Sequence, residues 1–245
     1  MTYCISDIHG CYDEYLRLLE KIEFSEADTL YILGDVVDRG YAIMDCLNHA
    51  MQAKNIYCLK GNHEQQMLEY YDGAGNNWPR LGGGNTVSQA AVHFDDGQWR
   101  AIVSKIRSWP LYKVIKINGK RFFLSHAGID PQKTLREQTP DDLTWGRQSF
   151  YRAIGMKGHI CVFGHTPTPV IRDYDDNCAV WFDEKHRDKV CIDCACVYGG
   201  ALAALRLEDG KVFYAESLRK RSRKGRAMAF RVKGGGSVPL EPTEP

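Results

Sequence analysis

The stretch from Gly34 to Gly40 places two carboxylates and a guanidinium in one short loop. Its chemically active side chains belong to Asp35, Asp38 and Arg39. An apolar run over residues 29–33 precedes it, and apolar residues at helical spacing follow it. This pattern is typical of the turn at the carboxyl end of a strand, where open α/β sheets hold their ligands. Such a loop could bind a cation and an anion together, although Asp and Gly are also common in ordinary turns.

Four further loops carry residues of the same kinds, and each follows an apolar, strand-like run. In chain order they contain Asp7 and His9, Asn62 and His63, His126, and His165. The carboxyl ends of neighbouring parallel strands meet at one edge of a sheet. We therefore expect the five loops to converge on a single site.

These oxygen and imidazole groups suit two divalent cations such as Mn²⁺, Fe or Zn²⁺, and no thiolate is needed. Sites with two metal ions hold them about 3.5–4 Å apart, and Asp35, in the central loop, is the natural bridge between them. A water acted on by two ions has its pKa lowered from 15.7 towards about 7, which supplies hydroxide near neutral pH. The expected ligands are Asp7, His9 and Asp35 for one ion, and Asp35, Asn62, His126 and His165 for the other.

The elements that must position these loops follow two patterns. In the first half, strand, loop and helix alternate, with a helix expected at 12–22, a strand at 29–33, a helix at 43–51 and a new strand at 56. This repeat predicts parallel strands joined by helical crossovers. In the second half, Asn118-Gly119 and Asp209-Gly210 favour hairpins. Short strands are expected there at 170–171, 179–182, 189–192 and 202–207. The sequence thus predicts an α/β protein with two facing mixed sheets flanked by helices.

The whole chain of 245 residues is 44% hydrophobic and carries a formal net charge of +1. These values favour one domain with a large core, and they favour neither nucleic acid nor a membrane as a partner. Nine cysteines without a secretory signal favour reduced thiols and a cytoplasmic location. We expect a catalytic domain over residues 1–218 and a flexible tail over 219–245, basic at first and then rich in Gly and Pro. A monomer is the default expectation.

The motifs together resemble those of the calcineurin-like metallophosphoesterases and, among these, the phosphoprotein phosphatase family. The resemblance covers residues 3–207, and the Asp38-Arg39-Gly40 extension carries the narrower assignment. Ser6 stands where the family usually has Gly. The matching motifs are Asp7-x-His9-Gly10, Gly34-Asp35-x-Val37-Asp38-Arg39-Gly40, Gly61-Asn62-His63-Glu64, His126-Ala127-Gly128 and Gly164-His165.

The resemblance implies the ligand set given above, with Mn²⁺ expected and Fe or Zn²⁺ as alternatives, in a four-layer sandwich. It also implies that His63 is a general acid held by Asp38. Imidazole has a suitable pKa for giving a proton to a leaving oxygen. Arg39 would bind phosphate oxygens through paired charge-assisted hydrogen bonds. The family has a second arginine after a tryptophan, and Arg147 fits that position, with Arg152 as its competitor.

Three functions fit these motifs. The first is a compact serine/threonine protein phosphatase of the bacterial and phage type, whose partner is a phosphorylated protein or peptide. The second is symmetrical hydrolysis of dinucleoside tetraphosphates into two nucleoside diphosphates. The loops over residues 70–100 and 130–155 would distinguish these two. The third, a phosphate-binding module without catalysis, is disfavoured because neither a ligand nor the acid is missing.

Overall fold

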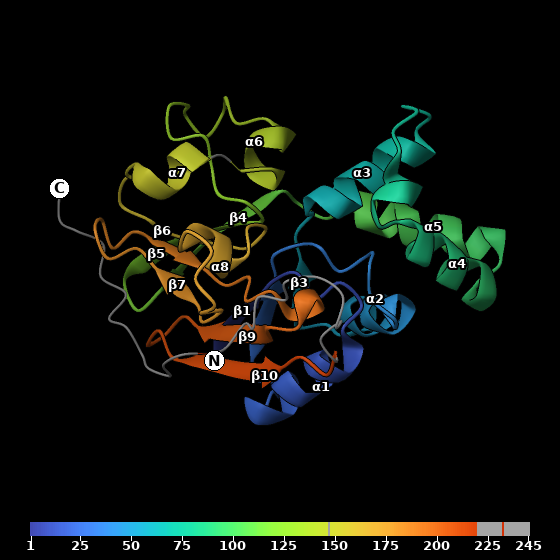
Figure 1. The fold of residues 1–245 in the computed structure, drawn as a ribbon, viewed down its shortest axis with the longest axis horizontal. Coiled ribbons are helices and arrows are strands. Elements are labelled where there is room, and N and C mark those ends of the chain that lie inside the picture. The colour runs from blue at the N-terminus through green and yellow to red at the C-terminus, as the bar shows by residue number, and fades with distance from the viewer. Residues whose placement is uncertain (147, 220–231, 233–245) are drawn as a thin grey trace.

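The computed structural model of the chain describes residues 1–146, 148–219 and 232. Two five-stranded sheets face each other, and helices cover their outer surfaces (Figure 1). The expected four-layer α/β sandwich is therefore confirmed. Arg147 and most of the expected tail, residues 220–231 and 233–245, lie outside the described residues.

The first sheet has the strand order β10-β9-β1-β2-β3. Three of its strands pair in parallel, as the repeating pattern of the first half predicts, while β9 runs antiparallel to both β1 and β10. Its strands are β1 (Thr2–Ile5), β2 (Thr29–Ile32), β3 (Ile56–Cys58), β9 (Ala201–Arg206) and β10 (Val212–Glu216).

The second sheet has the order β4-β5-β6-β8-β7. The hairpin expected at Asn118-Gly119 joins β4 to β5, but β5, β6 and β8 are parallel. The second half of the chain therefore combines antiparallel pairs, β4 with β5, β7 with β8 and β9 with β10, with two parallel pairs whose strands are joined by longer crossovers. The strands are β4 (Tyr112–Ile117), β5 (Lys120–Ser125), β6 (Ile160–Phe163), β7 (Trp181–Phe182) and β8 (Lys189–Cys191).

The helices form groups on either side of the sandwich (Figure 1). On the first sheet lie α1 (Tyr12–Lys21) and α2 (Ile43–Gln52). A separate group lies beside the first sheet. It consists of α3 (Asn62–Tyr71), the 3-10 turn η1 (Trp78–Leu81), α4 (Gly84–His93) and α5 (Asp96–Arg107). On the side of the second sheet lie α6 (Pro140–Thr144), α7 (Gln148–Arg152) and α8 (Thr168–Ile171), and η2 (Cys196–Tyr198) precedes β9.

Two local expectations were wrong. Residues 170–171 end helix α8 and are not a strand, because Pro167 and Pro169 bracket its first turn, where proline's fixed φ suits a helix start. Helix α3 was not expected from apolar spacing. Its buried face is mostly polar, and only Met67 and Leu68 are buried apolar residues on it.

Successive side chains on a strand point to opposite faces of its sheet, so the apolar core consists of separate clusters on the different faces. On β5, Phe122 and Leu124 point between the two sheets, whereas Phe123 packs on the outer face with Leu143 and Phe150. A third cluster fills the space between the first sheet and its helices. Both faces of each sheet are thus buried, which holds the strand ends of the two sheets in fixed relative positions. In the described parts of the chain, no helix is long and apolar enough to cross a membrane.

Candidate functional site

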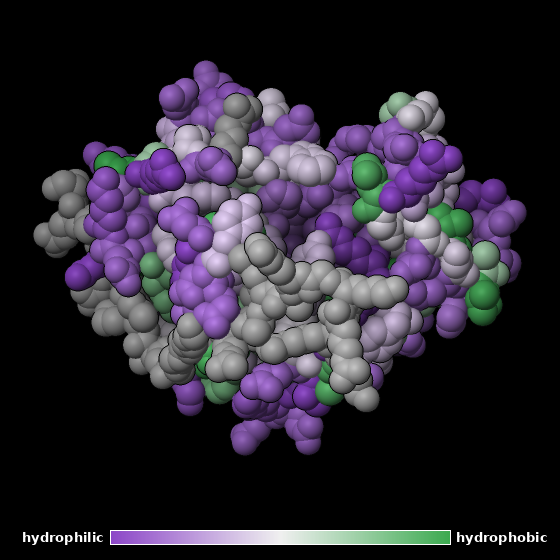
Figure 2. Space-filling model, viewed as in Figure 1, coloured by the Kyte–Doolittle hydropathy of each residue, from purple (hydrophilic) through white to green (hydrophobic). Residues whose placement is uncertain are grey.

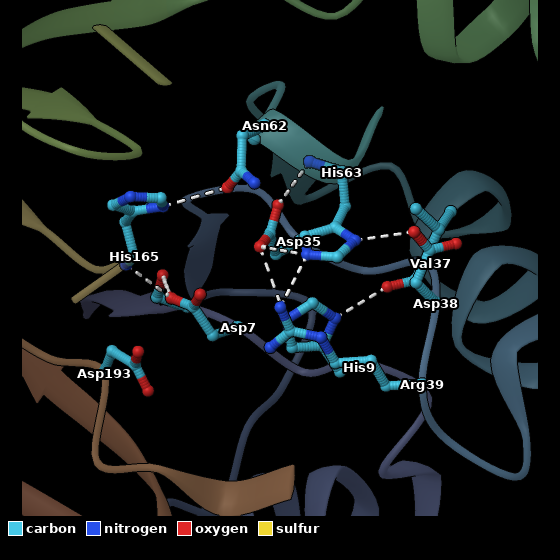
Figure 3. Close-up of polar contacts among 12 residues, drawn as sticks. Asp7, His9, Asp35, Val37, Asp38, Arg39, Asn62, His63, His165 and Asp193 are labelled. Atoms are coloured by element: carbon cyan, nitrogen blue, oxygen red, sulfur yellow. Dashed lines mark hydrogen bonds and ion pairs between the residues drawn. The ribbon is translucent and has the colours of Figure 1, made fainter. Parts of the chain in front are cut away.

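The six predicted metal ligands lie together at the ends of five strands, and Figure 3 labels five of them, all except His126. Three of these strands belong to the first sheet and two to the second. The site therefore lies where the carboxyl ends of the parallel strands of both sheets meet. Asp7 and His9 follow β1, Asp35 follows β2, Asn62 follows β3, His126 follows β5 and His165 follows β6.

The loops adopt strained backbone conformations and approach one another closely. Six residues of the site have positive φ, a region that side chains other than glycine seldom adopt and that clusters at functional sites. They are Asp7 (53°), His9 (44°), Asp35 (55°), Asp38 (73°), Arg39 (66°) and His165 (67°). A side chain at Gly61 would bring its Cβ within 2.1 Å of the Asp35 Oδ1 atom, so the loops after β2 and β3 need glycine there.

Two buried histidines direct a ring nitrogen at Asp35. His9 Nδ1 lies 2.7 Å from the Val37 carbonyl oxygen, and His126 Nδ1 lies 2.8 Å from that of Leu33. A carbonyl oxygen only accepts hydrogen bonds, so Nδ1 carries the proton in both rings. The other ring nitrogen, Nε2, lies 3.3 Å from Asp35 Oδ2 in His9 and 3.5 Å from Oδ1 in His126. Ring nitrogens that face a carboxylate in this way are placed to hold a cation between them.

Asn62 and His165 complete the second half of this cluster. Asn62 Oδ1 lies 2.9 Å from both His126 Nε2 and His165 Nδ1. Burial, together with the nearby His126, lowers the pKa of His165 to about 4. Its imidazole is therefore neutral near pH 7, which is the form that binds metal ions.

The geometry fits a pair of cations that share one carboxylate. Within the site, donor atoms that lie within 4.8 Å of one another form two groups, His9 with Asp35 and His63, and Asp7 with Asp35 and His126. Asp35 belongs to both. Although burial alone would raise the pKa of Asp35, His126 and His63 hold it well below its usual value, so it is a carboxylate. Among the described residues, these two groups offer oxygen and nitrogen donors and no thiolate, which suits Mn, Fe or Zn.

His63 is held by a buried carboxylate. Its Nδ1 lies 2.6 Å from Asp38 Oδ2, which also accepts a hydrogen bond of 2.7 Å from the Trp78 indole. The Thr86 hydroxyl donates to the other oxygen of Asp38 at 2.5 Å. Burial opposes protonation of His63, but Asp35 and Asp38 raise its pKa above the ordinary value. The ring is thus fixed with Nε2 towards the centre of the site.

Arg39 lies at the entrance of the same site. One guanidinium nitrogen is 2.8 Å from His63 Nε2, and another donates to the Tyr198 hydroxyl at 2.6 Å. The pocket has a volume of about 250 Å³, and α3 contributes Asn62, His63 and Gln66 to its wall. Figure 2 shows hydrophilic residues around a hollow between the surfaces that α6 and α3 form.

Three supporting residues had no role assigned from the sequence. Glu64 is fully buried and accepts four backbone N–H groups from the loops after β2 and β3. Its place in the motif Gly61-Asn62-His63-Glu64 was the only signal. Trp78 and Thr86 reach Asp38 from positions 40 and 48 residues further along the chain. Trp78 is fully buried, so it is a packed anchor as well as a support for the site.

The structure describes only one of the two candidates for a second arginine. Arg147 lies outside the described residues, so the structure does not place it. Arg152 ends α7 and is exposed. It is not among the described residues that line the site pocket.

A family model for calcineurin-like phosphoesterases matches residues 2–200. The chain is also 35% identical over 139 residues to proteins named symmetrical bis(5'-nucleosyl)-tetraphosphatase from Salmonella typhimurium strain LT2 and Salmonella typhi. These matches cover 55% of this chain and 45% of each relative. The chain thus spans about half the length of the curated relatives it matches.

Solved structures share the fold at low sequence identity. A proposed diadenosine tetraphosphatase matches with a TM-score of 0.67 at 20% identity, over 89% of this chain and 94% of that one. A protein serine/threonine phosphatase from Saccharomyces cerevisiae matches with a TM-score of 0.59 at 17% identity, over 94% and 83% of the two chains. A cold-active protein-tyrosine phosphatase from a Shewanella species matches at 0.57 and 20%, over 87% and 80%. These likenesses support the fold and do not choose between substrates.

Proposed function

Since the chain belongs to the calcineurin-like phosphoesterase family, we propose that it hydrolyses dinucleoside tetraphosphates symmetrically, releasing two nucleoside diphosphates. The observation that carries this proposal is the 35% identity to proteins named for that activity. The match covers only part of those proteins. We therefore infer the substrate from the relatives, and we infer the chemistry from the residues of the site. In the reaction, water adds to phosphorus and the central P–O–P bridge breaks, with the leaving diphosphate taking up a proton.

The residues of the site suit this chemistry. Two divalent ions, expected to be Mn²⁺, would be held by the six clustered ligands and would supply positive charge to the phosphate oxygens and make a water more acidic. Arg39 binds the phosphate oxygens, because a guanidinium forms paired charge-assisted hydrogen bonds with them. When phosphate takes over the Arg39 contact, His63 Nε2 is free to carry the proton for the leaving oxygen. Asp38 keeps the ring in the tautomer and orientation that this requires.

The rim of the site suits a substrate that carries nucleobases. Leu81 and Trp145 line the pocket and are 59% and 47% exposed, and Tyr198 beside Arg39 is 56% exposed. The Trp145 ring also lies edge-on to the ligand His165, with centroids 5.8 Å apart. The exposed rings of Trp145 and Tyr198, next to a phosphate site, offer surfaces on which a base can stack. A phosphoserine residue itself carries no ring.

Hydrolysis of phosphoserine and phosphothreonine in proteins is the second candidate. Its support is the Asp38-Arg39-Gly40 extension, through which the motifs resemble the phosphoprotein phosphatases. Both candidates need the same metal ligands, acid and phosphate-binding arginine. They differ in the bond that breaks, which is a phosphoanhydride in one and a phosphate monoester in the other, and in what lies beyond the phosphate.

One competition assay separates the two candidates. The purified chain is given Mn²⁺ with equal amounts of diadenosine tetraphosphate and a phosphoserine peptide, and the products are separated by chromatography. We expect ADP as the main product. AMP together with ATP would contradict symmetrical cleavage, and faster release of inorganic phosphate from the peptide would favour the second candidate.

A Trp145→Ala variant tests the stacking surface in the same assay. We expect KM for diadenosine tetraphosphate to rise about tenfold or more, because stacking a base on an aromatic ring contributes about 1–3 kcal/mol. The rate with para-nitrophenyl phosphate should change little. Trp99→Ala, on α5, is the matched control. An unchanged KM in Trp145→Ala would contradict the proposal that a base stacks on the rim of the site.

A further inference from the structure

A second pocket, of about 440 Å³, opens at the edge of the sandwich where β3 and β4 are the outermost strands. Its walls come from residues 50–54 at the end of α2, from β3 with the residue that follows it, and from the segment over residues 105–113, which runs from the last turn of α5 into β4. Of the described residues, none lines both this pocket and the site pocket. The pocket is therefore separate from the proposed active site.

One wall of this edge pocket is a pair of stacked aromatic rings. Tyr31 and Tyr57 occupy paired positions on β2 and β3, and their ring centroids lie 5.5 Å apart with an interplanar angle of 27°. Tyr57 is 51% exposed, so much of its ring remains in contact with water. Trp109, almost fully buried, adds a second aromatic side chain. This wall offers a flat apolar surface to a planar ring.

The rim of the edge pocket is positively charged. Lys54, Lys105 and Lys113 line it from three different segments, and all three are exposed. Among the described residues that line it, none is acidic. The formal net charge of the whole chain is only +1, so three lysines around one opening are a local concentration of positive charge. The positive electrostatic potential of these lysines favours an anion at the opening.

We propose that the edge pocket binds a nucleoside phosphate, with the base against Tyr57 and the phosphates towards the three lysines. The pocket volume falls within the range of about 300–1,000 Å³ that small-molecule sites usually have. A planar ring joined to a compact anion is the ligand class that matches both the aromatic wall and the charged rim. Binding here requires no metal and no hydrolysis, so the inference stands apart from the proposed activity.

Photolabelling with 8-azido-ADP tests this site on the full chain. The protein is kept in excess EDTA to prevent turnover, irradiated, digested and mapped by mass spectrometry. We expect labelled peptides from residues 50–60 or 105–113. Unlabelled ADP should compete at least tenfold better than inorganic phosphate or adenosine, because only ADP makes both kinds of contact.

Variants make the test specific. The triple substitution Lys54→Ala, Lys105→Ala and Lys113→Ala should reduce labelling of these peptides at least tenfold, as should Tyr57→Ala alone. Lys116→Ala, Lys157→Ala and Lys185→Ala together remove the same charge from exposed lysines elsewhere and should leave labelling unchanged. Activity on para-nitrophenyl phosphate reports that each variant is folded.

Three results would overturn the inference. One is labelling confined to peptides of the site pocket, such as the one that contains Trp145. Another is equal labelling of the wild type and the triple variant. The third is competition by inorganic phosphate as effective as that by ADP, since that would leave the aromatic wall without a role.

Discussion

At the scale of single residues, Asp38 is a buried carboxylate that supports His63. Both of its oxygens are occupied, one by His63 and Trp78 and the other by Thr86. The carboxylate is fully buried. It therefore orients His63, whose other ring nitrogen faces the pocket and is the one assigned to the proposed proton transfer.

His63→Asn should lower turnover by about 10²–10⁴-fold on an alkyl phosphate, because a positioned acid contributes about that much. The loss should be smaller on para-nitrophenyl phosphate, whose leaving group needs little protonation. The measurement is kcat on both substrates, with metal content determined by mass spectrometry. Full activity on the alkyl phosphate would show that another group supplies the proton.

Asp35→Asn should lose bound metal as well as activity. Each oxygen of Asp35 faces a different histidine, and an asparagine keeps only one oxygen and loses the negative charge. Metal per chain after gel filtration in Mn²⁺ is the quantity to measure. His93→Gln, an exposed histidine on α4, is the control and should bind metal like the wild type. Undiminished metal in Asp35→Asn would exclude this carboxylate as the bridge.

At the scale of elements, Glu64 connects the start of α3 to the loop that follows β2 through hydrogen bonds. Its carboxylate accepts N–H groups of Asp35, Val36 and Gly61, each at 2.8 Å, and that of Val37 at 3.1 Å. Glu64 follows His63 directly in the chain. The same side chain thus fixes both the loop of Asp35 and the helix turn of His63.

Glu64→Gln should lower the free energy of unfolding by about 3 kcal/mol. A buried amide cannot accept all four N–H groups, and each hydrogen bond to a charged partner contributes about 1.5–3 kcal/mol. Chemical denaturation followed by circular dichroism measures the change. Glu69→Gln on the same helix, where the carboxylate is only half-buried, is the control and should change stability little. Equal stability of the two variants would contradict this role for Glu64.

How far the sequence predicts these elements depends on the range of the interactions that form them. Apolar runs before Asp7 and Asp35 predict the strand ends, and with them the convergence of the loops, because that signal is local. Helix α3 was not predicted, because its buried face carries site residues such as His63 and so lacks the apolar spacing that indicates a helix. The contact of Trp78 with Asp38 joins residues 40 positions apart. Spacing along the chain says nothing about such a pair.

At the scale of the whole molecule, the ligand cluster joins the two sheets. Asp7, Asp35 and Asn62 follow strands of the first sheet, whereas His126 and His165 follow strands of the second. The cluster thus brings negative charge and lone pairs from both halves of the sandwich into one buried place. Cations bound there would hold the halves together and would be lost when the chain unfolds.

Removal of metal by EDTA should therefore lower the thermal stability of the whole domain. An ion present at 100 times its dissociation constant stabilises the folded state by about 2.7 kcal/mol. For a chain of this size, that corresponds to a fall in Tm of about 5–10 °C per ion. Differential scanning calorimetry with and without EDTA measures it, and added Mn²⁺ should restore the original Tm. Asp35→Asn should show a much smaller difference, because it binds less metal. A Tm that EDTA leaves unchanged in the wild type would mean that cations do not connect the sheets in the folded protein.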